Sequence, residues 1–166
     1  FMVHDWLSHG ESDPEQQHEI PTPAGDDWPA PVMRIPGTRA AESRPGEEGR
    51  PATYTNTETH WWDASQIYGS SLARQLQVRT DPATGKLLKN GKLGLTERGH
   101  LPLELNSSPH GLELAGVNAN WWVGLSTLHT LFAREHNTID DRLKLDYPEM
   151  SGEWLFQKAR LVLSAL

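Results

Sequence analysis

The chain has 166 residues and a formal net charge of −7, with 15 Lys and Arg against 22 Asp and Glu. This length is enough for one domain or part of one, and the acidic balance gives no support to nucleic-acid binding. The absence of cysteine excludes disulfides, thiolate zinc sites and a cysteine nucleophile. We find no apolar run near the roughly 20 residues that span a bilayer, and no signal-peptide pattern.

Both ends of the chain have helical patterns. The first nine residues, FMVHDWLSH, are typical of the tail of a helix that ends at Gly10. Residues 151–166 carry apolar side chains at helical spacing, with no Gly, Asn or Pro stop signal behind them. We therefore expect a fragment of a longer protein, cut at both ends.

The segment 10–58 contains eight prolines, at positions 14, 21, 23, 29, 31, 36, 45 and 51. Such a segment cannot be helical throughout, and an irregular connection of this length is uncommon in a compact domain. The apolar residues Trp28, Val32, Met33 and Ile35 are interspersed among the prolines. They favour a segment that wraps over a larger body rather than a disordered one.

Two short elements are predicted in the middle of the chain. Residues 71–80, SLARQLQVRT, predict a short helix. In residues 86–95, Asn90-Gly91 stands between apolar residues, which predicts a β-hairpin.

The strongest helical pattern covers residues 121–145. One stripe at helical spacing contains Trp122, Leu125, Leu128, Phe132, His136, Ile139 and Leu143. Asn120 is expected to cap this helix, and Ser151 to cap the final helix, 151–166. With little strand signal elsewhere, the predicted fold class is all-α, mostly helical, with long irregular loops and a short β-hairpin.

The stretch THWWDAS suggests a cluster of oxygen atoms. Thr59, Trp61, Asp63 and Ser65 lie two residues apart, so in an extended backbone they face the same side. Hydroxyl, carboxylate and carbonyl oxygens suit Ca²⁺, and Trp61 could contribute only its carbonyl. A capped turn is the commoner origin of such a pattern. A single carboxylate makes a weak calcium site, so a second one is expected, and Asp5 is free to supply it.

His4 and Asp5 form the second candidate site. On a helix their side chains point about 100° apart, so they would serve two neighbouring sites better than one. A lone histidine of this kind is more often packed and hydrogen-bonded than catalytic. An iron site built on this pair is weak, because no second histidine is placed to complete a facial triad.

The third candidate is His136, on the apolar stripe of the helix 121–145. Its neighbours are Arg134, Glu135 and Asn137, and a buried histidine satisfied by neighbours is the favoured interpretation. The aspartate pairs 26–27 and 140–141 are predicted to be solvated surface. The remaining histidines have no metal-ligand spacing such as HExxH.

Several motifs occur in the chain in a particular order: HDWLSH (4–9), THWWDASQIYGS (59–70), KNGKL (89–93), LFAREHNTIDDRLK (131–144) and FQKARLVLSA (156–165). Together they resemble the haem peroxidase superfamily that includes cyclooxygenases and animal peroxidases. They are most similar to its fatty-acid α-dioxygenase branch. The motifs occur in the family's order and cover most of the chain outside the proline-rich segment.

The resemblance implies a domain organisation. Residues 1–166 would be part of a single haem peroxidase-like catalytic domain. Its parts would be a distal-haem helix (1–9), a proline-rich wrap (10–58), a calcium loop (59–70) and core helices 121–145 and 151–166.

The resemblance also implies roles for individual residues. His4 matches the distal haem histidine, and Asp5 matches the calcium-ligating carboxylate beside it. Thr59, Trp61 (through its carbonyl), Asp63 and Ser65 match the family's calcium loop. Arg134 and His136, in REHN, match a motif on a long core helix that we interpret as structural. One helix would then present a histidine to the haem and a carboxylate to calcium.

The implied cofactors are haem b and Ca²⁺, and the implied substrates are a fatty acid with dioxygen or peroxide. The distal imidazole would move a proton between peroxide oxygens, which is general acid–base chemistry suited to histidine. A tyrosyl radical would then remove hydrogen from the carbon next to the fatty-acid carboxylate, where dioxygen adds. In the family, the proximal histidine, the radical tyrosine and the carboxylate-binding groups follow the part matched here. We therefore expect activity in the parent protein and not in the fragment.

Two alternatives stay open. A haem peroxidase that oxidises small donors would lack a tyrosine a few residues before its proximal histidine. A calcium-stabilised binding module without haem would show no Soret absorption but would still melt at a higher temperature with calcium. We expect a cytoplasmic or membrane-peripheral location, since fatty acids partition to membrane surfaces.

Overall fold

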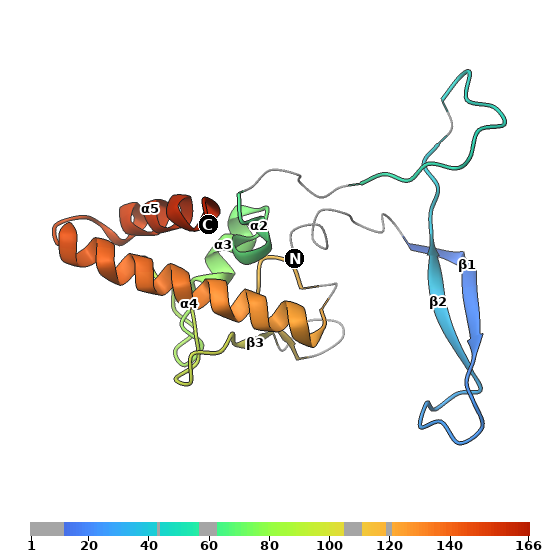
Figure 1. Cartoon of the computed structure of the whole chain (residues 1–166), viewed down its shortest axis with the longest axis horizontal. Coiled ribbons are helices and arrows are strands. Elements are labelled where there is room, and N and C mark those ends of the chain that lie inside the picture. The colour runs from blue at the N-terminus through green and yellow to red at the C-terminus, as the bar shows by residue number, and fades with distance from the viewer. Residues whose placement is uncertain (1–11, 43, 57–62, 105–110, 119–120) are drawn as a thin grey trace. The chain divides into compact units, whose positions relative to one another are not determined.

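The structure is a computed structural model, and it describes residues 12–42, 44–56, 63–104, 111–118 and 121–166 (Figure 1). Contacts within the chain divide it into two compact units, one within residues 6–58 and one that contains residues 59–166. The assignment of the whole chain to one catalytic domain stays a prediction.

The first unit contains an antiparallel β-hairpin, where the sequence predicted only an irregular segment. Strand β1 (Ser12–Pro21) pairs with β2 (Val32–Thr38), from Ser12 opposite Thr38 to Pro21 opposite Val32. The register shifts once, in the first half of β1. The prediction that this part of the chain has little strand structure was therefore wrong.

The prolines do not prevent this hairpin. In a two-stranded ladder, alternate N–H groups of each strand point away from the partner, so Pro21 and Pro36 need not remove a ladder bond. The connecting loop is closed by Thr22, whose backbone N–H donates to the Pro31 carbonyl at 3.0 Å. The Thr22 hydroxyl also donates to the Ala30 carbonyl at 2.9 Å. Local hydrogen bonds thus bring the two strands together.

The second unit is built on two helices, α4 (Val123–Asp146) and α5 (Gly152–Ser164), which pack against each other (Figure 1). Both predicted helices are confirmed. Ser151 caps α5 as predicted, because its hydroxyl accepts from the Trp154 backbone N–H at 3.3 Å. The predicted N-cap of α4 was wrong: the helix is preceded by Trp122, which makes no side-chain capping bond. Asn120, the predicted cap, lies outside the described residues.

The buried faces of α4 and α5 meet a single apolar cluster. The buried residues of α4 are Leu125, His129, Ala133, His136 and Asp140, and those of α5 are Leu155, Phe156, Ala159 and Leu163. Trp122 is 51% exposed, so the predicted stripe effectively begins one turn later. Four of the five buried positions on α4 are small or polar, and hydrogen bonds and close backbone contacts therefore contribute to this core.

Two short helices precede the long pair. Helix α3 (Leu72–Val78) confirms the predicted helix in 71–80, and the Ser71 hydroxyl caps it by accepting from the Arg74 N–H. Helix α2 (Ser65–Tyr68) is one turn long and delivers Ile67 and Tyr68 to the core.

The β-hairpin predicted over residues 86–95 was wrong. Apart from one isolated bridge, Thr80 to Leu87, the segment makes no strand pairs, and Gly91 adopts a φ of 98°. Residues of this segment bond to α4 instead. A second small antiparallel sheet is formed by β3 (Leu103–Glu104) and β4 (Leu112–Glu113). The all-α prediction is therefore confirmed only in part: helices form the core, beside two small two-stranded sheets.

Candidate functional site

The predicted site residues fall into two groups. His4, Asp5, Thr59 and Trp61 lie outside the described residues. Asp63 and Ser65 are described, and they lie at the start of α2.

Asp63 and Ser65 are held in a capped turn. The Ser65 backbone N–H donates to Asp63 Oδ1 at 3.0 Å. Between them, Ala64 adopts the left-handed conformation, with φ 54° and ψ 32°. The backbone is therefore not extended here, and the argument from alternating side chains fails for this pair. Their carboxylate and hydroxyl oxygens remain chemically suited to a hard cation.

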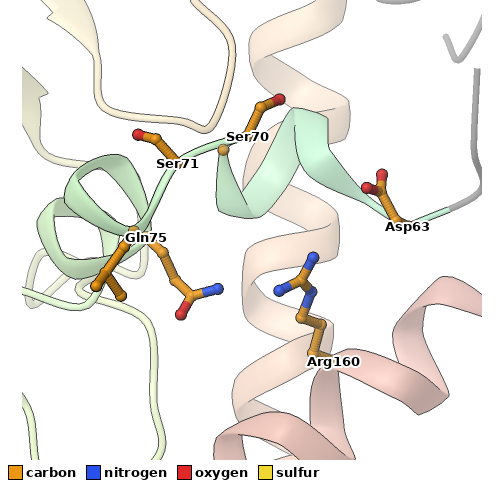
Figure 2. A pocket seen from close by; sticks show the side chains of 7 residues that line it. Asp63, Ser70, Ser71, Gln75 and Arg160 are labelled. Atoms are coloured by element: carbon orange, nitrogen blue, oxygen red, sulfur yellow. The ribbon is translucent and has the colours of Figure 1, made fainter. Parts of the chain in front are cut away.

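Asp63 also lines a cavity of about 420 Å³ between α2, α3 and α5 (Figure 2). Ser70, Ser71 and Gln75 line the side formed by α3 and the loop before it. Figure 2 shows Arg160 reaching from α5 towards α2. Its guanidinium carbon lies 5.3 Å from the centre of the Tyr68 ring, a cation–π contact. Five of the seven lining residues are polar, and Asp63, Gly69 and Ser70 belong to the predicted calcium loop.

A buried tyrosine–histidine pair lies at the centre of the core. Tyr68 and His136 are both 0% exposed, and the Tyr68 hydroxyl lies 2.7 Å from His136 Nδ1. His136 Nε2 lies 3.0 Å from the Gly91 carbonyl, which can only accept, so Nε2 carries the proton. Nδ1 is then the acceptor, and the Tyr68 hydroxyl donates to it. Both ring nitrogens of the histidine are satisfied, which confirms the structural interpretation.

Burial sets the protonation of this pair. Burial lowers the pKa of His136 to about 4 and raises that of Tyr68 well above its usual value. Both groups are therefore neutral near pH 7. A neutral donor–acceptor pair, packed in an aromatic cluster with Phe156, is suited to stabilise the core.

The KNGKL motif packs on the REHN motif. We refer to residues 89–93 as the NGK turn. The Asn137 side chain forms two hydrogen bonds with the Leu93 backbone: it accepts from the N–H at 2.8 Å and donates to the carbonyl at 3.1 Å. With the bond from His136 to Gly91, consecutive residues of α4 bind the turn through three hydrogen bonds. Arg134, in the same motif, is exposed.

Sequence reasoning missed the buried charged residues. Arg79 is 4% exposed, pairs with Glu153 at 2.8 Å and stacks on the Phe156 ring with 4.0 Å to its centre. Asp140 is 1% exposed, so the prediction that it is solvated surface was wrong, although Asp141 beside it is exposed. The helical spacing from His136 to Asp140, i to i+4, was the signal that could have found it.

Neither a metal cluster nor a spanning helix is found in the described part of the chain. Among residues 12–42, 44–56, 63–104, 111–118 and 121–166, no three His, Cys, Asp or Glu side chains gather as metal ligands. Within the same residues, every helix is too short or too polar to cross a bilayer.

Comparisons with known proteins place this geometry in a family. Residues 1–166 match the family model described as animal haem peroxidase. Alpha-dioxygenase PIOX of Nicotiana tabacum is 37% identical over 166 residues, which is all of this chain and 24% of that protein. Alpha-dioxygenase 2 of Arabidopsis thaliana is 32% identical over the same length.

Solved structures agree with these sequence matches. A crystal structure of a variant Oryza sativa fatty acid alpha-dioxygenase with palmitic acid has a TM-score of 0.70 and 32% identity. The match covers 99% of this chain and 25% of that one. The chain thus spans about a quarter of the length of the relatives it matches. Because the family model matches its whole length, the chain belongs to the animal haem peroxidase family.

Proposed function

We propose that this chain forms the distal-haem portion of a fatty-acid α-dioxygenase, which in the full-length protein adds O₂ at the carbon next to the substrate carboxylate. The observation that carries the proposal is that the whole of this chain matches six plant alpha-dioxygenases at 32–37% identity, over 24–25% of the length of each. The nematode peroxidase mlt-7, by contrast, matches over 76% of the chain. The palmitic acid held by the Oryza sativa enzyme supports a long-chain fatty acid as substrate.

In this proposal, haem b supplies the redox chemistry when bound, and the chain supplies proton transfer and positioning. His4 would hold and move a proton at its imidazole, on the distal side of the haem. The permanent iron ligand would come from another part of the full-length protein. A substitution of His4 should therefore leave haem binding intact while it removes oxidative activity.

Calcium would be held by Asp5, Thr59, the Trp61 carbonyl, Asp63 and Ser65. The two described members fit such an ion in their chemistry, since a carboxylate and a hydroxyl lie at one turn. Asp63 Oδ1 already accepts the Ser65 N–H, which fixes the carboxylate's orientation before any ion binds. The ion would fasten this turn to the helix that carries His4.

A haem peroxidase that oxidises small donors is the second candidate. The mlt-7 match, 32% identical over 133 residues, favours it only for that part of the chain. A calcium-stabilised module without haem is disfavoured by the family membership.

The two enzyme candidates are separated by substrate. Haem-loaded full-length protein is incubated with palmitate and O₂, and separately with an aromatic donor and hydrogen peroxide. The proposal expects a 2-hydroperoxy product by mass spectrometry in the first reaction. Donor oxidation without any fatty-acid product would assign the protein to the second candidate and refute the dioxygenase.

A further inference from the structure

The NGK turn rests directly on the junction between α4 and α5. At Gly91, with φ +98°, an added Cβ would overlap Asp140 Oδ1 and would lie 3.0 Å from both the Gly152 carbonyl oxygen and the Leu155 Cβ. At Gly152, an added Cβ would overlap the Lys89 carbonyl. Two glycines thus allow the turn and the start of α5 to approach backbone to backbone. The contact leaves no room for a water molecule between Gly91 and Asp140.

Asp140 is the charged group at this contact. Its side chain is 1% exposed, and its Oδ1 has no hydrogen-bond partner among the described residues. The neighbouring cations are engaged elsewhere: Lys92 pairs with Asp141 at 2.6 Å, and Arg79 pairs with Glu153 at 2.8 Å. A carboxylate in this position would be buried without a direct counter-ion, which is strongly unfavourable.

Some neighbours of Asp140 raise the pKa of its carboxyl group and others lower it. Burial has the largest effect and raises the pKa, and Asp141 raises it further. Lys92 and Lys144 lower it, as does Arg79. Burial prevails, and the pKa rises to about 6.

We propose that Asp140 is a pH-dependent latch: as a neutral carboxylic acid it lets the NGK turn sit on α4 and α5, and on ionisation it releases the turn. The folded pKa lies above the unfolded value of 3.8, so the contribution of Asp140 is fully present below that value. It is lost as the pH rises through about 6. The latch concerns the fold of this unit and does not rest on the proposed haem chemistry.

His136 faces the same turn and has the opposite pH dependence. It binds the Gly91 carbonyl, and its pKa is lowered to about 4, so it favours the folded state as the pH rises. A pH series on the native chain would therefore mix two opposing effects. The effect of Asp140 is isolated by the difference between the native chain and Asp140→Asn at each pH.

The readout is hydrogen exchange at the Leu93 amide, which donates to Asn137 Oδ1. Protection factors, corrected for the intrinsic exchange rate, are compared between pH 4 and pH 7. With pKa values of 3.8 and about 6, the protection ratio of Asp140→Asn to native chain should rise roughly 50-fold over this range. The matched control is Asp146→Asn, on the same helix, whose ratio should stay within about fivefold because its ion pair with Arg142 is exposed.

A flat ratio for Asp140→Asn, or an equal rise for Asp146→Asn, overturns the latch. If Asp140→Asn does not fold, the side-chain carboxyl of Asp140 is titrated in the native chain by ¹³C NMR. A midpoint well above 5 supports the latch, and a midpoint near 3.8 refutes it.

Discussion

Tyr68→Phe removes one oxygen atom from the centre of the core. The substitution keeps the ring and its edge-on contact with Phe156, whose ring centre lies 5.7 Å away. It deletes the 2.7 Å hydrogen bond to His136 and leaves Nδ1 of a fully buried imidazole unpaired. A net hydrogen bond contributes about 1 kcal/mol, and an unsatisfied buried acceptor costs about 1–3 kcal/mol. We therefore expect the free energy of unfolding to fall by about 1–3 kcal/mol.

The assay is urea denaturation of the 166-residue chain at pH 7, with Tyr147→Phe as the matched control. Tyr147 is 44% exposed, and its substitution should change the free energy of unfolding by less than about 0.5 kcal/mol. In thermal melts, Tyr68→Phe should lower the midpoint by about 2–4 °C for each kcal/mol lost. If Tyr68→Phe were as stable as the control, the hydrogen bond between Tyr68 and His136 would not stabilise the core.

Three further outcomes are expected. Ser151→Ala deletes the acceptor for the Trp154 N–H at the start of α5 and should cost about 1 kcal/mol in urea denaturation; an unchanged midpoint would remove Ser151 as a cap. The folded pKa of His136 lies near 4, below the usual histidine value of 6.5, so its contribution to stability is lost as the pH falls from about 6.5 to 4. His136→Gln should flatten this part of the pH profile of stability, and a profile as steep as that of the native chain would contradict this expectation. In the full-length protein, a calcium chelator should lower the melting temperature of the native form but not of Asp63→Ala, and equal melting of the native form with and without chelator would refute the calcium loop.

The helices of the second unit could be predicted because their apolar spacing and capping residues are local signals. The cap at Ser151 is one example, since it needs only a hydroxyl one residue before the first turn. The start of α4 was missed because Asn120 carries the same local signal, although the helix begins after Trp122. A propensity for capping does not select which turn of the chain enters the core.

The interactions around the NGK turn could not be predicted, because they are tertiary. Asn90-Gly91 is a strong signal for a tight turn, and a turn does form, with Gly91 in the left-handed region. The partner of the turn is α4, some 45 residues further along the chain, through His136 and Asn137. Asp140 was predicted to be exposed because aspartate side chains usually are. Gly91 approaches its carboxyl group closely and covers it, which the local sequence does not indicate.

The hairpin β1–β2 was missed for a different reason. The prolines exclude a continuous helix over residues 10–58, and the segment was therefore expected to be irregular, although proline is compatible with a two-stranded ladder. For the candidate site, the order of the motifs along the chain indicates the family, which the comparisons confirm. The calcium and haem roles of His4, Asp5 and the residues around Asp63 remain predictions.

The most direct test of the proposed function is oxygen uptake with palmitate by the haem-loaded full-length protein and two histidine variants. Both variants lie in the HDWLSH motif: His4→Gln replaces the proposed distal histidine, and His9→Gln is its matched control. We expect uptake by the native protein and by His9→Gln, and none by His4→Gln, with equal Soret absorption in all three. Palmitate-dependent uptake by His4→Gln at the native rate, or none by the native protein, would contradict the account.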